Sequence, residues 1–151
     1  MGFYGHPDVA KRSESWGLLK ILAQFNPIPW ICMGDFNETL SPSEKWGGSL
    51  RIRSQMRGFQ QALEQCELTE LNSFGPKFTW SNCREGMDFI KEKLDRGVAN
   101  QEWRDLFPNA EIKVEFSMGS DHLPIFLLLR LRLLRHKMVF RKIISVFYGV
   151  Y

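Results

Sequence analysis

The sequence lacks several features that would assign it to a special class of protein. None of its apolar runs reaches the roughly 20 residues that a helix needs to span a bilayer, so we expect no membrane partner. It contains no internal repeat and no low-complexity tract, which argues against a solenoid or a long disordered linker. No secretory signal opens the sequence.

Cysteine and net charge are also scarce. The three cysteines form no C-x-x-C pair and are odd in number, so they predict neither a disulfide framework nor a zinc site. A reducing, intracellular compartment suits such a sequence. The net charge of +3 excludes a polycation. Nucleic acid or another phosphorylated partner is compatible with this charge but is not required by it.

Hydrophobic and aromatic residues are plentiful. They make up 44% and 13% of the 151 residues, and there are twelve Phe and five Trp. This composition is typical of a globular chain with a packed interior and not of a disordered one. At this length we expect one domain, large enough to bury a core.

Hydrophobic spacing predicts a mixture of helices and short strands. Two amphipathic helices are expected over Ser13–Phe25 and Arg51–Cys66, because their apolar residues recur at intervals of three and four. A short third helix is expected over 101–107, and residues 73–77 are expected to form a turn. Short apolar or alternating runs predict strands near the start and at 30–33, 68–71, 78–81, 93–98, 112–116 and 123–129.

Two short polar motifs adjoin the most apolar of these strands. Asp35 and Asn37 directly follow the run at 30–33, and Asp121 and His122 directly precede the run at 124–129. If both strands deliver these residues to one sheet edge, the four side chains come within reach of one another. Carboxylate, amide and imidazole groups at one edge are suited to Mg²⁺-assisted chemistry on phosphate.

Phosphodiester hydrolysis needs an activated water and an offset for the charge on the phosphate. Asp35 is a candidate base, which the Asn37 amide could orient. His122 could donate to a phosphate oxygen if a buried carboxylate fixes its ring, and Asp95 is the candidate for that partner. Asp121 is a candidate ligand of a metal ion or a water.

Each feature also has an ordinary structural interpretation. The Gly34–Asn37 segment alone is a common Asx turn. Asp95 next to Arg96 could be a surface ion pair of little consequence. Tyr4 could contact phosphate or could be a core aromatic with a wet hydroxyl, and Trp80 is expected to be a packing residue. The joint occurrence of the motifs, in order, favours the functional interpretation.

The motif set resembles the endonuclease/exonuclease/phosphatase superfamily with its DNase I-like fold. It is most similar to the endonuclease domain of plant non-LTR, LINE-type retrotransposons. The segments that carry the resemblance occur in the family's order: Gly2–Pro7, Arg12 with Ser15–Leu19, Gly34–Glu38, Phe78–Asn82, Lys93–Arg96 and Ser120–Pro124. Each segment is unspecific alone, whereas the ordered set is specific.

The resemblance implies an α+β fold: a two-sheet β-sandwich flanked by helices, with the site at the edge where the sheets meet. It implies an enzyme that nicks DNA with Mg²⁺ or Mn²⁺, which we expect to work in the nucleus. The metal would lie among Asp35, Asn37, Asp121 and His122.

The resemblance also implies residue roles. Asp35 matches the base that activates water, and Asn37 matches the amide that orients it. His122 matches the phosphate-binding histidine, and Asp95 matches the acid that holds this histidine. Tyr4 matches the tyrosine at the rim of the site.

Two departures from the family pattern affect these expectations. The family carries an early Asn motif and its principal metal-binding Glu before the Gly-Phe-Tyr-Gly segment, and neither is present here; Glu14 and Glu38 lie in the wrong places to replace that Glu. Beyond about residue 130 the basic and apolar sequence shows no family pattern. We therefore expect a partial domain over 1–130, without its N-terminal part, and a tail over 131–151 of unassigned structure.

The function expected from the sequence is DNA nicking that is impaired by loss of the metal-binding segment. Two alternatives stay open. One is a catalytically inactive remnant or binding module. The other is a phosphatase of the same superfamily that acts on a soluble phosphoester, although the segments at 78–82 and 93–96 favour the nuclease.

Overall fold

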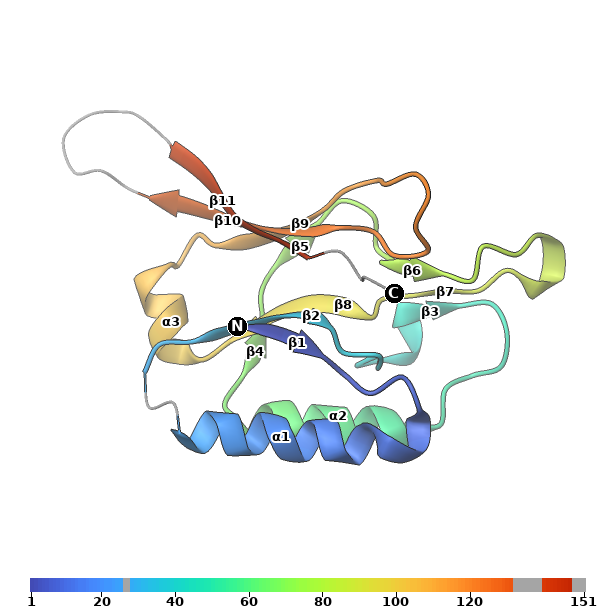
Figure 1. Ribbon diagram of the computed structural model, residues 1–151, viewed down its shortest axis with the longest axis horizontal. Helices are drawn as coiled ribbons and strands as arrows, with labels where there is room; N and C mark the ends of the chain where they lie inside the picture. The colour runs from blue at the N-terminus through green and yellow to red at the C-terminus, as the bar shows by residue number, and fades with distance from the viewer. Residues whose placement is uncertain (26–27, 132–139, 148–151) are drawn as a thin grey trace.

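The apolar run that ends at Met33 forms the centre of the first sheet. A computed structural model describes residues 1–25, 28–131 and 140–147 of the chain (Figure 1). The strand order in this sheet is β1 (Gly2–Tyr4), β2 (Ile31–Asp35), β8 (Asp95–Ala99) and β4 (Thr69–Glu70). β1 runs parallel to β2, whereas β8 runs antiparallel to both β2 and β4.

A second sheet packs against the first, and a small third sheet lies beside them (Figure 1). The second sheet has the order β11 (Phe140–Phe147), β10 (Ile125–Leu131), β9 (Glu111–Val114) and β5 (Ser73–Phe74). The third is antiparallel, with the order β3 (Lys45–Trp46), β7 (Lys91–Glu92) and β6 (Trp80–Ser81).

The helices α1 (Arg12–Phe25) and α2 (Arg53–Gln65) lie side by side against one face of the first sheet (Figure 1). The short helix α3 (Gln101–Leu106) follows β8. Three 3₁₀ turns cover η1 (Val9–Lys11), η2 (Pro42–Glu44) and η3 (Gly86–Asp88). In the part of the chain that the structure describes, no helix has both the length and the apolar character to cross a bilayer.

The first sheet is buried on both faces, which explains the unbroken apolar run in β2. Cys32 and Val98 belong to the core between this sheet and the helices, whereas Met33 and Ala99 belong to the core between the two sheets. This follows from the alternation of side chains along a strand. The same alternation decides which residues β2 presents at its end.

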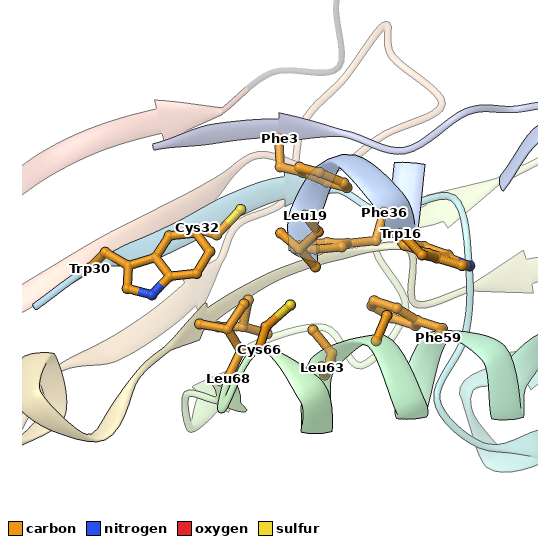
Figure 2. Packing of buried hydrophobic residues seen from close by; sticks show 12 residues of the cluster. Phe3, Trp16, Leu19, Trp30, Cys32, Phe36, Phe59, Leu63, Cys66 and Leu68 are labelled. Atoms are coloured by element: carbon orange, nitrogen blue, oxygen red, sulfur yellow. The ribbon is translucent and has the colours of Figure 1, made fainter. Parts of the chain in front are cut away.

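The core beneath the helices is aromatic (Figure 2). Phe3 stacks on Phe36 with ring centroids 4.8 Å apart, and Trp16 stacks on Phe59 at 4.5 Å. Phe36 also contacts Phe59, at 5.3 Å. This continuous set of rings fixes the helix pair against β1 and β2 and buries the residue between Asp35 and Asn37.

The predicted α+β architecture is confirmed: two sheets packed face to face, with helices. The helices at 13–25 and 51–66 and the strand at 30–33 are found within a few residues of their predicted bounds. The predicted turn at 73–77 is wrong at its start, since Ser73–Phe74 pair with β9 as β5. A two-residue edge strand has no alternation for sequence patterns to detect.

The predicted strand over 93–98 is also corrected. β7 ends at Glu92 and β8 begins at Asp95, because the backbone amide of Leu94 donates to the Thr79 hydroxyl instead of to a neighbouring strand. In the predicted tail over 131–151, β11 pairs antiparallel with β10 and extends the second sheet. The rest of that tail, 132–139 and 148–151, lies outside the described residues.

Candidate functional site

The register of the first sheet aligns three of the candidate residues. Tyr4 of β1 pairs with Asp35 of β2, and Asp35 pairs in turn with Asp95 of β8. β2 ends at Asp35, and the antiparallel β8 begins at Asp95. The carboxyl end of one strand and the amino end of its neighbour thus bring the two carboxylates together at one sheet edge.

A tight turn follows β2 and holds Asn37 against Asp35. The Asn37 backbone N–H donates to Asp35 Oδ1 at 2.7 Å, and its Nδ2 donates to Asp35 Oδ2 at 2.9 Å. Asn37 has a φ of 54°, in the left-handed region that asparagine tolerates better than most residues. The Asx turn of the ordinary interpretation is therefore present, and it orients the carboxylate that the functional interpretation selects.

His122 completes the group from the second motif. Its Nδ1 lies 2.9 Å from Asp95 Oδ2, and its Nε2 lies 3.9 Å from Asp35 Oδ2. The ring is 2% exposed. A carboxylate at Nδ1 fixes the ring orientation and directs Nε2 toward Asp35, as a positioned imidazole in a proton-transfer site requires.

Thr79 brings the two motifs together, and the sequence did not identify it as a site residue. Its buried hydroxyl accepts from the backbone amides of Leu94 and Asp95 at 3.0 and 2.9 Å. Its carbonyl accepts from the Leu123 amide at 2.7 Å. The sequence indicated Thr79 only indirectly, because Thr79 lies within the segment Phe78–Asn82 that matches a family motif.

Asp121 lies beside this group but faces another way. Its Oδ2 accepts from Trp80 Nε1 at 2.9 Å, and its carbonyl accepts from the Ser81 amide at 2.9 Å. An isolated bridge between Trp80 and His122 continues the contact. Trp80 is thus more than the packing residue that the sequence suggested, because its indole orients the acid next to His122.

Burial and like charge act together on Asp35. Loss of hydration, followed by the negative charge of Asp95, raises the pKa of Asp35 from 3.8 to about 6, although the Asn37 amide, His122 and Arg12 oppose the rise. For His122, burial lowers the pKa, but the hydrogen bond and charge of Asp95, with Asp35 and Asp121, outweigh it and raise the pKa above 6.5. The site therefore favours a cationic imidazole beside a carboxylate that titrates close to neutral pH.

Divalent metal binding is a separate question from this hydrogen-bonded group. Both Asp35 oxygens accept from Asn37, and the Asn37 amide nitrogen also donates to the Gly5 carbonyl at 2.8 Å. Across residues 1–25, 28–131 and 140–147, no group of three or more His, Cys, Asp or Glu side chains is arranged to hold a metal ion. The described side chains therefore form no all-protein cage for a divalent ion. Mg²⁺ usually keeps several waters and binds through one or two carboxylates together with substrate phosphates, so the site expected among Asp35, Asn37, Asp121 and His122 stays a prediction.

Most of the predicted site residues converge. Asp35, Asn37, Asp95 and His122 form one buried, connected group, and Tyr4 lies at its edge with 53% of its side chain exposed. The alternative of a surface Asp95–Arg96 ion pair is wrong, because both residues are buried and Arg96 pairs instead with Glu44 and Glu70.

Comparison with protein families identifies the family of this chain. A model of the family described as endonuclease-reverse transcriptase matches residues 2–126, a range that contains every candidate site residue. No curated protein matches the chain.

Proposed function

The chain belongs to the endonuclease-reverse transcriptase family, within the endonuclease/exonuclease/phosphatase superfamily, and we propose that it cleaves phosphodiester bonds as a DNA-nicking endonuclease. The observation that carries this proposal is the buried Asp35–His122–Asp95 group, with separations of 3.9 and 2.9 Å. The resemblance of the motif set to the endonuclease of plant LINE-type retrotransposons supports this proposal. Chromosomal DNA as the substrate would place the protein in the nucleus.

The side chains support a division of labour in hydrolysis. Asp35, whose pKa is about 6, can take a proton from a water molecule at neutral pH, where it is mostly ionised. Asn37 holds both oxygens of that carboxylate. The protonated form of His122, which the hydrogen bond and charge of Asp95 favour, can donate to a phosphate oxygen and offset charge there. Tyr4, exposed at the rim, can contact a phosphate of the bound strand.

Dependence on Mg²⁺ or Mn²⁺ rests on the family resemblance. Such an ion supplies charge neutralisation at the transferring phosphate. Since the described side chains form no group of three or more His, Cys, Asp or Glu around such an ion, the roles above involve protein groups only.

Nicking of supercoiled plasmid in Mg²⁺ tests the proposal. Asp35→Asn and His122→Ala should each lower the rate by about 10²–10⁴, the usual contribution of a positioned acid or base. Asp105→Asn, which changes an exposed carboxylate on α3, is the matched control and should nick like the wild type. Nicking that survives both site substitutions would contradict the assigned site. For the wild type, we expect EDTA to abolish nicking.

One observation favours a second candidate, a binding module without catalysis. It is the lack of a three-ligand metal group among the described side chains. Wild-type protein that binds DNA but gives no nicks in Mg²⁺ or Mn²⁺ would support it. Release of inorganic phosphate from a soluble phosphomonoester, without nicking, would instead support the phosphatase alternative.

A further inference from the structure

A second cluster of buried charges lies next to the Asp35–Asn37 turn. Glu38 immediately follows Asn37 and is 1% exposed. One of its oxygens accepts from Arg12 Nη1 at 2.7 Å, and the other lies 3.5 Å from Arg51 Nη1. Both oxygens of Glu38 therefore face a cation, and the turn is anchored from its C-terminal side.

Arg12 connects the turn after β2 with the loop after β1. Besides Glu38, its guanidinium donates to the carbonyl of His6 through Nε at 3.3 Å and to that of Pro7 through Nη2 at 3.1 Å. A planar guanidinium offers its donors in fixed directions, so one side chain can hold the two loops in a defined relation. The first residue of α1 thus acts as a clamp between the two loops.

The two loops also meet directly at the site. The Gly5 amide donates to the Asp35 carbonyl at 2.7 Å, and Asn37 Nδ2 donates to the Gly5 carbonyl at 2.8 Å. The contact is so close that a Cβ on Gly5 would overlap the Phe36 carbonyl. Any movement of the Gly5–Pro7 loop would therefore displace Asn37, and with it the carboxylate of Asp35.

We propose that Arg12 and Glu38 are positioning residues, which hold the Asp35–Asn37 turn in its hydrogen-bonded geometry by clamping it to the Gly5–Pro7 loop. The consequence for catalysis rests on the proposed function. A buried ion pair is a poor source of net stability, because the loss of hydration offsets most of the attraction. The fixed geometry of the Arg12–Glu38 pair is what matters at this site, because Asn37 has a left-handed backbone conformation that the surrounding contacts must maintain.

Two variants separate positioning from stability. Arg12→Met removes the clamp and leaves Glu38 with one cation fewer, which also destabilises the whole fold. The double variant Arg12→Met/Glu38→Gln leaves no charge of this pair behind, so its global unfolding should lie closer to the wild type while the clamp stays absent. Arg104→Met is the matched control: Arg104 donates to a backbone carbonyl, that of Glu70, away from the turn.

Amide hydrogen exchange measures how firmly the turn and the loop are held together, independently of any activity. In the double variant the amides of Asn37 and Gly5 should exchange at least about tenfold faster than in the wild type, equivalent to ~1.4 kcal/mol of local opening. The amides of β8 should keep their protection, and Arg104→Met should leave Asn37 and Gly5 unchanged. Unchanged exchange at both amides in the double variant overturns the positioning role, whatever the nicking assay gives.

Steady-state nicking then tests the catalytic consequence. The double variant should lose about tenfold in kcat with little change in KM, because both side chains of the pair are buried and the proposal places them behind the turn that carries Asp35 and Asn37. Faster exchange with an unchanged kcat would overturn the link to catalysis. A wild-type protein that does not nick would overturn the proposed function alone, and the exchange data would still decide the positioning role.

Discussion

Asp35 and Glu92 are carboxylates with the same exposure, 4% each, in surroundings of opposite charge. Glu92 accepts from Lys45 Nζ at 2.7 Å and forms a bidentate contact with Arg51. Asp35 instead shares its sheet edge with Asp95. Burial alone would raise the pKa of both carboxyls; the cations around Glu92 outweigh it and lower that pKa, whereas at Asp35 the pKa stays raised, at about 6.

This difference distinguishes the charge cluster around Glu92, which stabilises the fold, from the cluster around Asp35, which is suited to proton transfer. Around Glu92 the charges neutralise each other, and ionisation of the carboxylate is favoured by folding. At Asp35 the fold brings a second carboxylate close to a buried one, which is unfavourable unless a proton or another cation is shared among them. A carboxyl that titrates close to neutral pH is suited to receive a proton, so the less stable of the two clusters is the candidate site.

Removing the carboxylate from the structural cluster should have the largest effect on folding. Glu92→Ala leaves Lys45 and Arg51, with side chains 15% and 13% exposed, without their shared partner. We expect a loss of about 3 kcal/mol in the free energy of unfolding, the lower end of the range for broken buried pairs, because Arg51 keeps Glu38. Urea unfolding at pH 7 measures it.

The control for that measurement is Glu115→Ala, which breaks the exposed pair with Lys113. It should change the free energy of unfolding by no more than about 0.5 kcal/mol. Equal losses in the two variants would mean that the Glu92 cluster is no more structural than a surface pair.

Removing the charge of Asp35 should instead raise the free energy of unfolding, relative to the wild type, as the pH increases. Because the folded pKa is raised from 3.8 to about 6, the contribution of Asp35 to stability is fully present below pH 3.8 and is lost as the pH rises through about 6. The stability of Asp35→Asn relative to the wild type should therefore rise by about 1–3 kcal/mol between pH 4 and pH 8 in EDTA. The amide nitrogen of the new side chain faces the Asn37 donors, which lowers stability at both pH values and cancels in this difference. Urea unfolding as a function of pH measures the rise; a stability difference that does not change with pH would contradict it.

A smaller loss in the free energy of unfolding is expected for Trp80, whose neutral indole N–H donates to Asp121. Trp80→Phe removes the hydrogen bond from Nε1 to Asp121 but keeps an aromatic ring. The loss should be about 1 kcal/mol, typical of one hydrogen bond to a partly hydrated acid. Thermal unfolding at pH 7 measures it, with Trp46→Phe as the control, since Trp46 is exposed on β3 and stacks edge-on against Phe89. Equal losses of stability in the two variants would mean that the hydrogen bond from Trp80 to Asp121 makes no particular contribution.

The sequence predicted the parts of the fold whose pattern is local. The helix pair has apolar residues at helical spacing over three or more turns. β2 is an apolar run that contributes to the cores on both faces of its sheet, and β10 is an apolar run whose alternate residues join the core between the sheets. Two-residue strands such as β3 and β5 carry no such pattern and are defined only by their partners. Lys45 pairs with Glu92, 47 positions away, and Ser73 pairs with Ile112, 39 positions away.

The same distinction holds for the candidate site. Asp35, Asn37 and His122 could be selected because each lies in a short polar motif next to an apolar run. Asp95 could be selected as the candidate carboxylate partner of that histidine in the Lys93–Arg96 segment. The contacts of Thr79 with Asp95 and of Arg12 with Glu38 span 16 and 26 positions, and no spacing rule indicates them. One interpretation left open by the sequence placed Arg96 at the surface in an ion pair with Asp95. The fold buries Arg96 between Glu44 and Glu70, because the alternation of side chains along β8 directs it to the face opposite to that of Asp95.

The most direct test of the account is the titration of Asp35 itself, followed through its carboxyl carbon by NMR in EDTA. The wild-type protein should give a midpoint at about pH 6. Asp95→Asn should lower that midpoint, since it removes the neighbouring negative charge, whereas Asp105→Asn should leave it unchanged. An Asp35 that titrates near 3.8 in the wild type would contradict the claim that this sheet edge prepares a carboxylate to accept a proton.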